Sequence, residues 1–308
     1  MKRPTLKNTA PVFARGGEHS EKQLMQNILI VLLFFFIVQA LSLIAHDLLY
    51  AVIHTAGIRI TGEEQYTVPL YLTLPARLID IALVLIYCRF LERRGFRSMG
   101  FTRSRAVSDY LIGIAAGAAM LSASIGIAML GGGLTFAGTG KMPVLLLLLF
   151  IIGWMIQGFS EELGYRSYLM ISTGAYHKPL TALLVSAVCF AAGHCGNQNI
   201  TALAYVNLAL YAVFAGIYFL RTDSVWGVAA MHSTWNFMQG TFYGIEVSGN
   251  KPVNSVLVMS ANSGKDLLSG GTFGLEGGLA VTAVLVVSIA VVLLLPQRKQ
   301  PDAPAATA

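Results

Sequence analysis

Two glutamates and an arginine interrupt an apolar stretch of this chain: Glu161, Glu162 and Arg166, in the sequence SEELGYR. Charged side chains in apolar surroundings are costly, and they usually serve a function. On a helix, Glu162 and Arg166 are four residues apart and share a face, so their charges can pair. Glu161 points about 100° away from them. We therefore predict a supporting ion pair and a Glu161 that is free to act as a general base.

Two histidines and an amide supply further groups that could react together with Glu161: His194, His232 and Asn236. His232 and Asn236 are again four residues apart, so an imidazole and an amide share one helix face. Both can donate hydrogen bonds to an oxyanion that develops during acyl transfer. His194 with Glu161 could hold and deprotonate a water. The chemistry that this set predicts is hydrolysis.

We expect membrane helices to hold these groups in place. The chain is 55% hydrophobic and 12% charged, and a soluble domain carries about twice that charge. A helix needs roughly 20 apolar residues to cross a bilayer. Such stretches occupy 24–45, 110–140, 142–160, 179–220, 224–245 and 277–296, with a weaker one at 76–91. Because 179–220 is long enough for two passes, we predict an all-α polytopic membrane helix bundle with about eight transmembrane helices, within residues 23–296.

The weaker stretch carries two opposite charges. Arg77 and Asp80 are three residues apart, and at this spacing they can pair on one helix face. Asn207, in the middle of a later stretch, is expected to make a hydrogen bond between helices, as amides do in membranes.

The predicted helices bring the reactive groups to a similar depth. At about 1.5 Å per residue, counting from the turn near 174–179 puts Glu161 roughly 18 Å and His194 roughly 22 Å deep. Counting from the start of their own helix puts His232 about 12 Å and Asn236 about 18 Å deep. We predict that the four side chains meet in one layer, reached from the cytoplasmic side.

Lys and Arg predict the orientation, because basic loops stay on the cytoplasmic side of a membrane. If eight helices alternate, most basic residues, including six within 89–105, fall on one side. The other side receives Arg59, Lys141, Lys251 and Lys265. We therefore predict both termini in the cytoplasm, with disordered tails at 1–22 and 297–308. The net charge of +6 reflects this topology, and we expect no nucleic-acid partner.

Three motifs stand in order in the middle of the chain. They are SEELGYR with Glu161, Glu162 and Arg166, FAAGH with Phe190 and His194, and HSTWN with His232 and Asn236. Together they resemble the CPBP intramembrane proteases, the CAAX protease and bacteriocin-processing family, also called the Abi family, which includes the type II CAAX prenyl endopeptidases. The clear resemblance covers about 142–240, which we expect to be the protease core.

The resemblance implies hydrolysis of a peptide bond in a membrane-associated protein or peptide. It makes Glu161 the residue that activates water and His194 its partner, with His232 and Asn236 stabilising the oxyanion. The other motif residues would support the site: Glu162, Arg166 and Phe190.

Family members are often labelled metalloproteases, and a cofactor therefore stays open. Glu161, His194 and His232 are plausible zinc ligands. The sequence has no HExxH motif, and a glutamate base without metal explains the same residues. Zinc is possible, and the sequence does not require it.

Two other functions stay open on the same residues. Buried Glu, His and Arg also form proton relays in transporters, although no inverted repeat of the kind common in transporters is visible. A non-catalytic membrane scaffold could use the same fold.

The expected partners are the lipid bilayer and a membrane-associated peptide or protein. The expected location is a bacterial inner (plasma) membrane, because the chain is compact and has no organelle-type extension. The loop at 246–276, rich in Gly, Ser and Asn, is expected to be a mobile connection rather than a lid.

Overall fold

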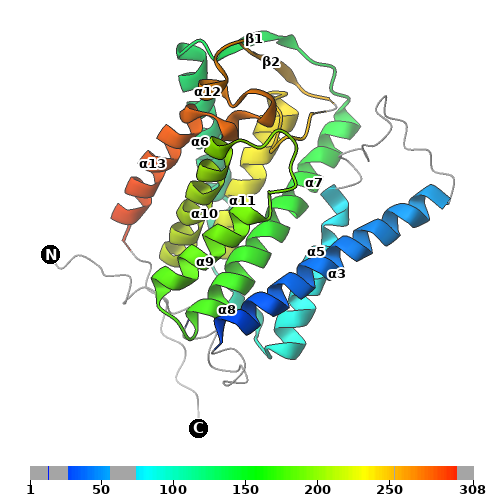
Figure 1. Ribbon diagram of the computed structural model, residues 1–308, viewed down its shortest axis with the longest axis vertical. Helices are drawn as coiled ribbons and strands as arrows, with labels where there is room; N and C mark the ends of the chain where they lie inside the picture. The colour runs from blue at the N-terminus through cyan, green and yellow to red at the C-terminus, as the bar shows by residue number, and fades with distance from the viewer. Residues whose placement is uncertain (1–12, 14–26, 56–73, 253, 297–308) are drawn as a thin grey trace.

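The computed structural model describes residues 13, 27–55, 74–252 and 254–296, without the side chains of residues 53 and 54. Within them the chain forms a helix bundle with a small two-stranded sheet at one end (Figure 1). The predicted tails at 1–22 and 297–308 lie outside the described residues, apart from Phe13.

Helices make up most of the described chain. The α-helices are α3 (Ile28–Thr55), α5 (Leu78–Ile86), α6 (Ala106–Leu130), α7 (Val144–Glu162), α8 (Ile171–Gly174), α9 (Pro179–Ala192), α10 (Ala202–Thr222), α11 (Val225–Asn236), α12 (Asp266–Ser269) and α13 (Leu279–Leu294). Wider π-helical turns are η2 (Tyr87–Leu91), η4 (Leu163–Met170) and η5 (Phe237–Phe242). Tighter 3₁₀ turns are η3 (Phe96–Met99), η6 (Gly271–Phe273) and η7 (Leu275–Gly277). The strands are β1 (Leu134–Thr139) and β2 (Leu257–Ala261).

Four helices in the described residues are long and apolar enough to cross a membrane. They span Ile28–Val52, Ala106–Leu130, Val144–Gly174 and Ala202–Thr222. Two shorter apolar helices are Pro179–Ala192 and Leu279–Leu294. The chain is therefore an integral membrane protein, whereas the eight predicted crossings and the orientation of the termini are not confirmed. The predicted stretches 110–140 and 224–245 are each divided between a helix and a second element, which apolar composition alone does not reveal.

The prediction of an all-α fold is wrong at the end of the bundle that carries the sheet. β1 pairs antiparallel with β2, with Leu134 opposite Ala261 and Thr139 opposite Leu257. Because α6 ends at Leu130, before three glycines, the chain can turn there and enter a strand. The loop at 246–276 contains β2, α12 and two 3₁₀ turns, so it carries more regular structure than a mobile connection.

The helix that carries His232 is held closely on two sides. α11 packs against α6 and against α7. A Cβ atom on Gly117 of α6 would collide with the backbone at Met231 of α11, and one on Gly158 of α7 would collide with Ser233. Small residues allow helix backbones to approach this closely in membranes. The position of His232 is thus set by glycines on its neighbours.

Asn207 joins two helices, as predicted. Its Nδ2 atom on α10 donates to the carbonyl oxygens of Glu276 at 2.7 Å and Gly278 at 2.9 Å. Its Oδ1 atom accepts a 2.7 Å hydrogen bond from the Thr282 hydroxyl on α13. The amide therefore fastens the start of α13 to α10.

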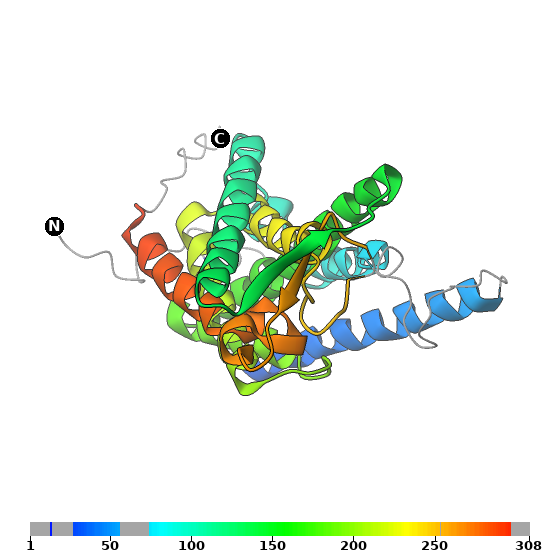
Figure 2. The same ribbon diagram turned by 90° about the horizontal axis from the view of Figure 1, so that it is seen from above.

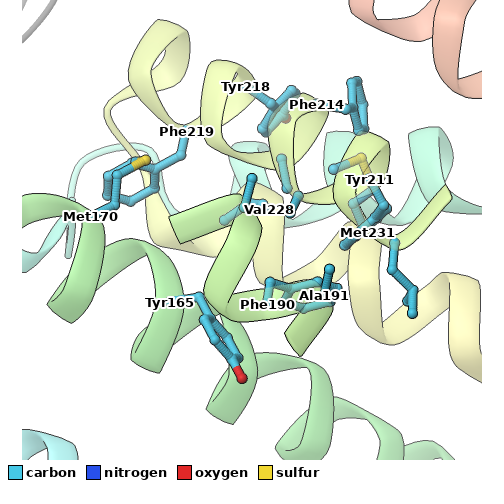
Figure 3. Packing of buried hydrophobic residues seen from close by; sticks show 14 of the residues in the cluster. Tyr165, Met170, Phe190, Ala191, Tyr211, Phe214, Tyr218, Phe219, Val228 and Met231 are labelled. Carbon is cyan, nitrogen blue, oxygen red and sulfur yellow. The ribbon is translucent and has the colours of Figure 1, made fainter. Parts of the chain in front are cut away.

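Aromatic side chains fill the core beside the motifs. Phe190 on α9 lies between Tyr165 and Tyr211, with ring centroids 5.1 and 5.8 Å away, and all three are seen in Figure 3. α3 packs against α5, and its C-terminal end extends beyond the rest of the bundle (Figure 2). α3 and α5 thus cover the side of the bundle on which α7 and η4 carry the first motif.

Candidate active site

The four predicted catalytic side chains line one cavity of about 760 Å³: Glu161, His194, His232 and Asn236. This volume lies in the range of roughly 300–1,000 Å³ that is usual for ligand pockets. Glu162 and Arg166 are fully buried and do not line the cavity. The structure thus brings together the groups that the spacing predicted, with the ion pair behind them.

Glu161, near the end of α7, has one oxygen satisfied and one without a partner. Its Oε1 atom accepts a 2.6 Å hydrogen bond from Gln157 Nε2. Its Oε2 atom is buried and has no hydrogen-bond partner among the described residues. The nearest cation-forming atom is His232 Nε2, at 3.8 Å from Oε2. Oε2 can therefore accept a hydrogen bond from a water or a substrate atom in the cavity.

His232 is oriented by Glu162. Its Nδ1 atom lies 2.8 Å from Glu162 Oε1, and because an ionised carboxylate only accepts, Nδ1 carries the proton. The Nε2 atom is then turned toward Glu161. The other oxygen of Glu162 lies 3.1 Å from Arg166 Nε, and both side chains are fully buried. The predicted pair is confirmed, and Glu162 has a second partner on another helix.

His194 lies just beyond its helix rather than within it. α9 ends at Ala192, with Gly193 as its C-cap, so the predicted position in a continuous helix is wrong. The His194 Nδ1 atom lies 2.8 Å from the Phe190 carbonyl oxygen. Since a carbonyl only accepts, Nδ1 carries the proton, and Nε2 is left as an acceptor.

Phe190 holds two other motif residues in place. Its ring centroid is 4.8 Å from that of His194, and the Arg166 guanidinium carbon lies 4.9 Å from the Phe190 ring centroid. A guanidinium over an aromatic face is attracted by the negative charge of the ring face. The second motif thereby supports the ion pair of the first.

Gln157 is a site residue that the sequence analysis missed. Asn236, the last residue of α11, donates from Nδ2 to Gln157 Oε1 at 2.9 Å. Because Gln157 Nε2 donates to Glu161, one amide links the first and third motifs. Gln157 is four residues before Glu161 on the same face of α7. This spacing could have identified Gln157 as a site residue from the sequence.

Arg77 and Asp80 also line the cavity, from α5 and the residue before it. Their side chains pair at 3.0 Å, as predicted from their spacing. Asp80 is also contacted from α3, by the Ser42 hydroxyl and by His46 Nε2 at 3.4 Å. The pair therefore joins α3 to the wall of the cavity.

The predicted access from the cytoplasmic side stays a prediction, because the orientation of the bundle in the membrane is not confirmed. The lining of the cavity includes Asn197, Ser248 and Asn250. These residues belong to connections at the end of the bundle that carries the sheet (Figure 1). This is the end opposite to the turn at 174–179, from which helix depth was counted.

The zinc candidates share the cavity without forming a ligand cluster. Among the described residues, no group of three or more His, Cys, Asp or Glu side chains is arranged to hold a metal ion. Glu161, His194 and His232 therefore do not fit zinc as they stand.

Comparison with known families covers the region of the three motifs. Residues 143–238 match the family model described as type II CAAX prenyl endopeptidase Rce1-like. No curated protein and no solved structure significantly matches the chain. The matched segment contains all four cavity-lining candidates. The match confirms the predicted resemblance: residues 143–238 are similar to the Rce1-like type II CAAX prenyl endopeptidases, which is consistent with the CPBP family.

Proposed function

We propose that this protein is an intramembrane endopeptidase that hydrolyses a peptide bond in a membrane-associated protein or peptide. The Rce1-like match supports a protease. The observation that carries the proposal is the buried, unpartnered Oε2 atom of Glu161 in a cavity shared with His194 and His232. The catalytic core is the segment 142–240.

Glu161 and His194 activate the water. Glu161 Oε2 and His194 Nε2 are both acceptors, so a water in the cavity can donate one hydrogen to each. Glu161 takes a proton as the water oxygen attacks the carbonyl carbon of the peptide bond. Gln157 holds Oε1 and thereby fixes the orientation of the carboxylate.

Asn236 and His232 stabilise the oxyanion. Asn236 Nδ2 has two hydrogens, and one is used by Gln157, so the second can be donated to the tetrahedral intermediate. His232 donates from Nε2 when it carries both ring protons. The carboxylates of Glu161 and Glu162 then flank this cation, at 3.8 and 2.8 Å.

Glu161 completes the reaction as a general acid. The proton taken from water passes from Glu161 Oε2 to the leaving nitrogen while the carbon–nitrogen bond breaks. The products are a carboxylic acid and a free amine, and Glu161 returns to its ionised form.

The bacterial inner membrane and the cytoplasmic termini stay predictions, which reporter fusions at each end of the chain would test.

The experiment compares new protein termini in membranes of cells that produce the parent or Glu161→Gln. The exposed acidic residue Asp266 provides a control of equal charge change, Asp266→Asn. We expect termini that depend on Glu161, with a loss of at least about a hundredfold in Glu161→Gln and none in the control. Cleavage by a well-inserted Glu161→Gln protein would overturn the mechanism. No Glu161-dependent termini with a well-expressed parent would favour the scaffold.

A further inference from the structure

A second cavity, of about 800 Å³, lies where α6 begins. It shares no lining residue with the candidate active site. Its walls include three aromatic and three basic side chains: Phe96, Phe101, Trp226, Arg97, Arg103 and Arg105. The proposed hydrolysis uses none of them.

The loop that forms this cavity is fastened to the start of α11. The Gly100 carbonyl accepts a 2.9 Å hydrogen bond from the Val225 N–H group. The Trp226 indole donates to the Thr102 carbonyl at 2.9 Å. The rings of Phe101 and Trp226 meet edge to face, with centroids 5.4 Å apart. These contacts give the cavity a fixed aromatic floor.

The charge at the rim is positive. Arg103 is exposed and Arg105 is half-buried, and no acidic residue lines the cavity. The acidic residues nearest to the lining along the chain, Asp109 and Asp223, are 1% and 3% exposed and lie outside the lining. The rim therefore favours a ligand that carries negative charge.

The position of the cavity adds an apolar requirement. α6 is one of the helices long enough to cross a membrane, so its first turn lies at the level where lipid headgroups meet acyl chains. From the cavity, Val107 and Leu111 continue along one face of α6 and are 74% and 59% exposed. A ligand at this place meets arginines at one end and an exposed aliphatic ridge at the other.

We propose that this cavity binds an anionic phospholipid, with its phosphate on Arg103 and Arg105 and an acyl chain along Val107 and Leu111. Basic pockets beside transmembrane helices suit such headgroups, and the aromatic floor suits the boundary between headgroup and tail. The proposal does not depend on the proposed protease activity, because the two cavities share no lining residue.

The test titrates the purified full chain with phosphatidylglycerol or phosphatidylcholine and counts bound lipid by native mass spectrometry. The test variant is Arg103→Gln with Arg105→Gln. The control is Arg89→Gln with Lys178→Gln, which removes two exposed charges outside the cavity. At about 1 kcal/mol, or roughly five- to sixfold, for each arginine, we expect roughly thirtyfold weaker phosphatidylglycerol binding in the test variant. The control should bind like the parent.

Three outcomes would overturn the proposal. Equal weakening in both double variants would mean that diffuse charge attracts the lipid. Equal binding of phosphatidylcholine and phosphatidylglycerol by the parent would mean that negative charge is not recognised. Displacement by glycerol 3-phosphate as effective as by phosphatidylglycerol would mean that the acyl chain contributes nothing. If the double variant does not fold, Arg103→Gln alone removes one exposed arginine and should weaken binding about fivefold.

Discussion

At the scale of single residues, Glu162 connects the first motif to the third. Its two oxygens contact Arg166 at 3.1 Å and His232 at 2.8 Å. Arg166 in turn lies over the ring of Phe190 in the second motif. The three motifs are thus one contact network, in which the buried pair positions His232 and Glu161 faces the cavity.

Arg166→Ala tests the role of this pair. The substitution leaves Glu162 buried without its cation, and breaking a buried ion pair costs about 3–5 kcal/mol. We expect less protein in the membrane and a lower unfolding midpoint in detergent, with Arg89→Ala, an exposed arginine on η2, as control. An Arg166→Ala protein as stable as its parent yet inactive would mean that Arg166 acts in the chemistry.

Metal removal tests the same site without changing the chain. The mechanism uses only side chains, so cleavage that depends on Glu161 should continue after dialysis against a chelator. The measurement is the amount of product before and after dialysis, beside a zinc protease treated in the same way. Activity that is lost on dialysis and restored by zinc would contradict the metal-free mechanism.

At the scale of elements, the motif helices change their winding directly after the site residues. α7 ends at Glu162 and continues as the π-helical η4, and α11 ends at Asn236 and continues as η5. π-Helical turns are rare and often occur at functional sites. α11 also depends on close contact with α6, where Gly117 faces the backbone at Met231.

Gly117→Ala should push α11 away from α6. Overpacking a close contact costs about 1–3 kcal/mol, and a displacement of about 1 Å at a catalytic group can reduce activity a hundredfold. We expect a lower unfolding midpoint and cleavage reduced at least about tenfold. Gly126→Ala is the matched control, because a Cβ at Gly126 on the same helix meets nothing within 4 Å. Equal behaviour of the two variants would show that the helix contact tolerates a methyl group.

At the scale of the whole molecule, Glu276 fastens the segment after β2 to the bundle. Its carboxylate accepts hydrogen bonds from the Gln239 amide and, at 3.3 Å, from the Ser248 hydroxyl. Its backbone carbonyl accepts from Asn207 on α10. Burial raises the pKa of Glu276 from its ordinary value of 4.5 to about 7, although the hydrogen bonds from Gln239 and Ser248 act against this rise.

This raised pKa predicts a pH-dependent stability. Between pH 4.5 and 7 the unfolded chain releases the Glu276 proton before the folded chain does, so stability is greatest below pH 4.5 and declines until about pH 7. The shift corresponds to a loss on the order of 3 kcal/mol. We expect the unfolding midpoint of the parent to fall from pH 5 to pH 8 and that of Glu276→Gln to fall less. Glu246→Gln, on the same loop, serves as the control. An unchanged pH slope in Glu276→Gln would contradict the assignment.

The sequence alone predicted membrane helices, the family resemblance and the four candidate residues that line the cavity. Its information is local: apolar length predicts membrane helices, and the spacing of four residues predicts shared faces. This information was sufficient to predict the ion pair of Glu162 and Arg166. The position of Asn207 in an apolar stretch was sufficient to predict its hydrogen bond between helices. The motifs then identified His194, although local pattern did not show that it lies beyond the end of its helix.

How these faces meet became visible in the packing of the helices. The contact of Glu162 with His232 and the bridge of Gln157 to Asn236 depend on the distance and rotation between α7 and α11, which glycines on neighbouring helices set. The sheet and the end of the bundle at which the cavity borders on loops were likewise not predicted. Spacing along one helix fixes which side chains share a face, whereas partners on different helices follow from packing across the whole bundle.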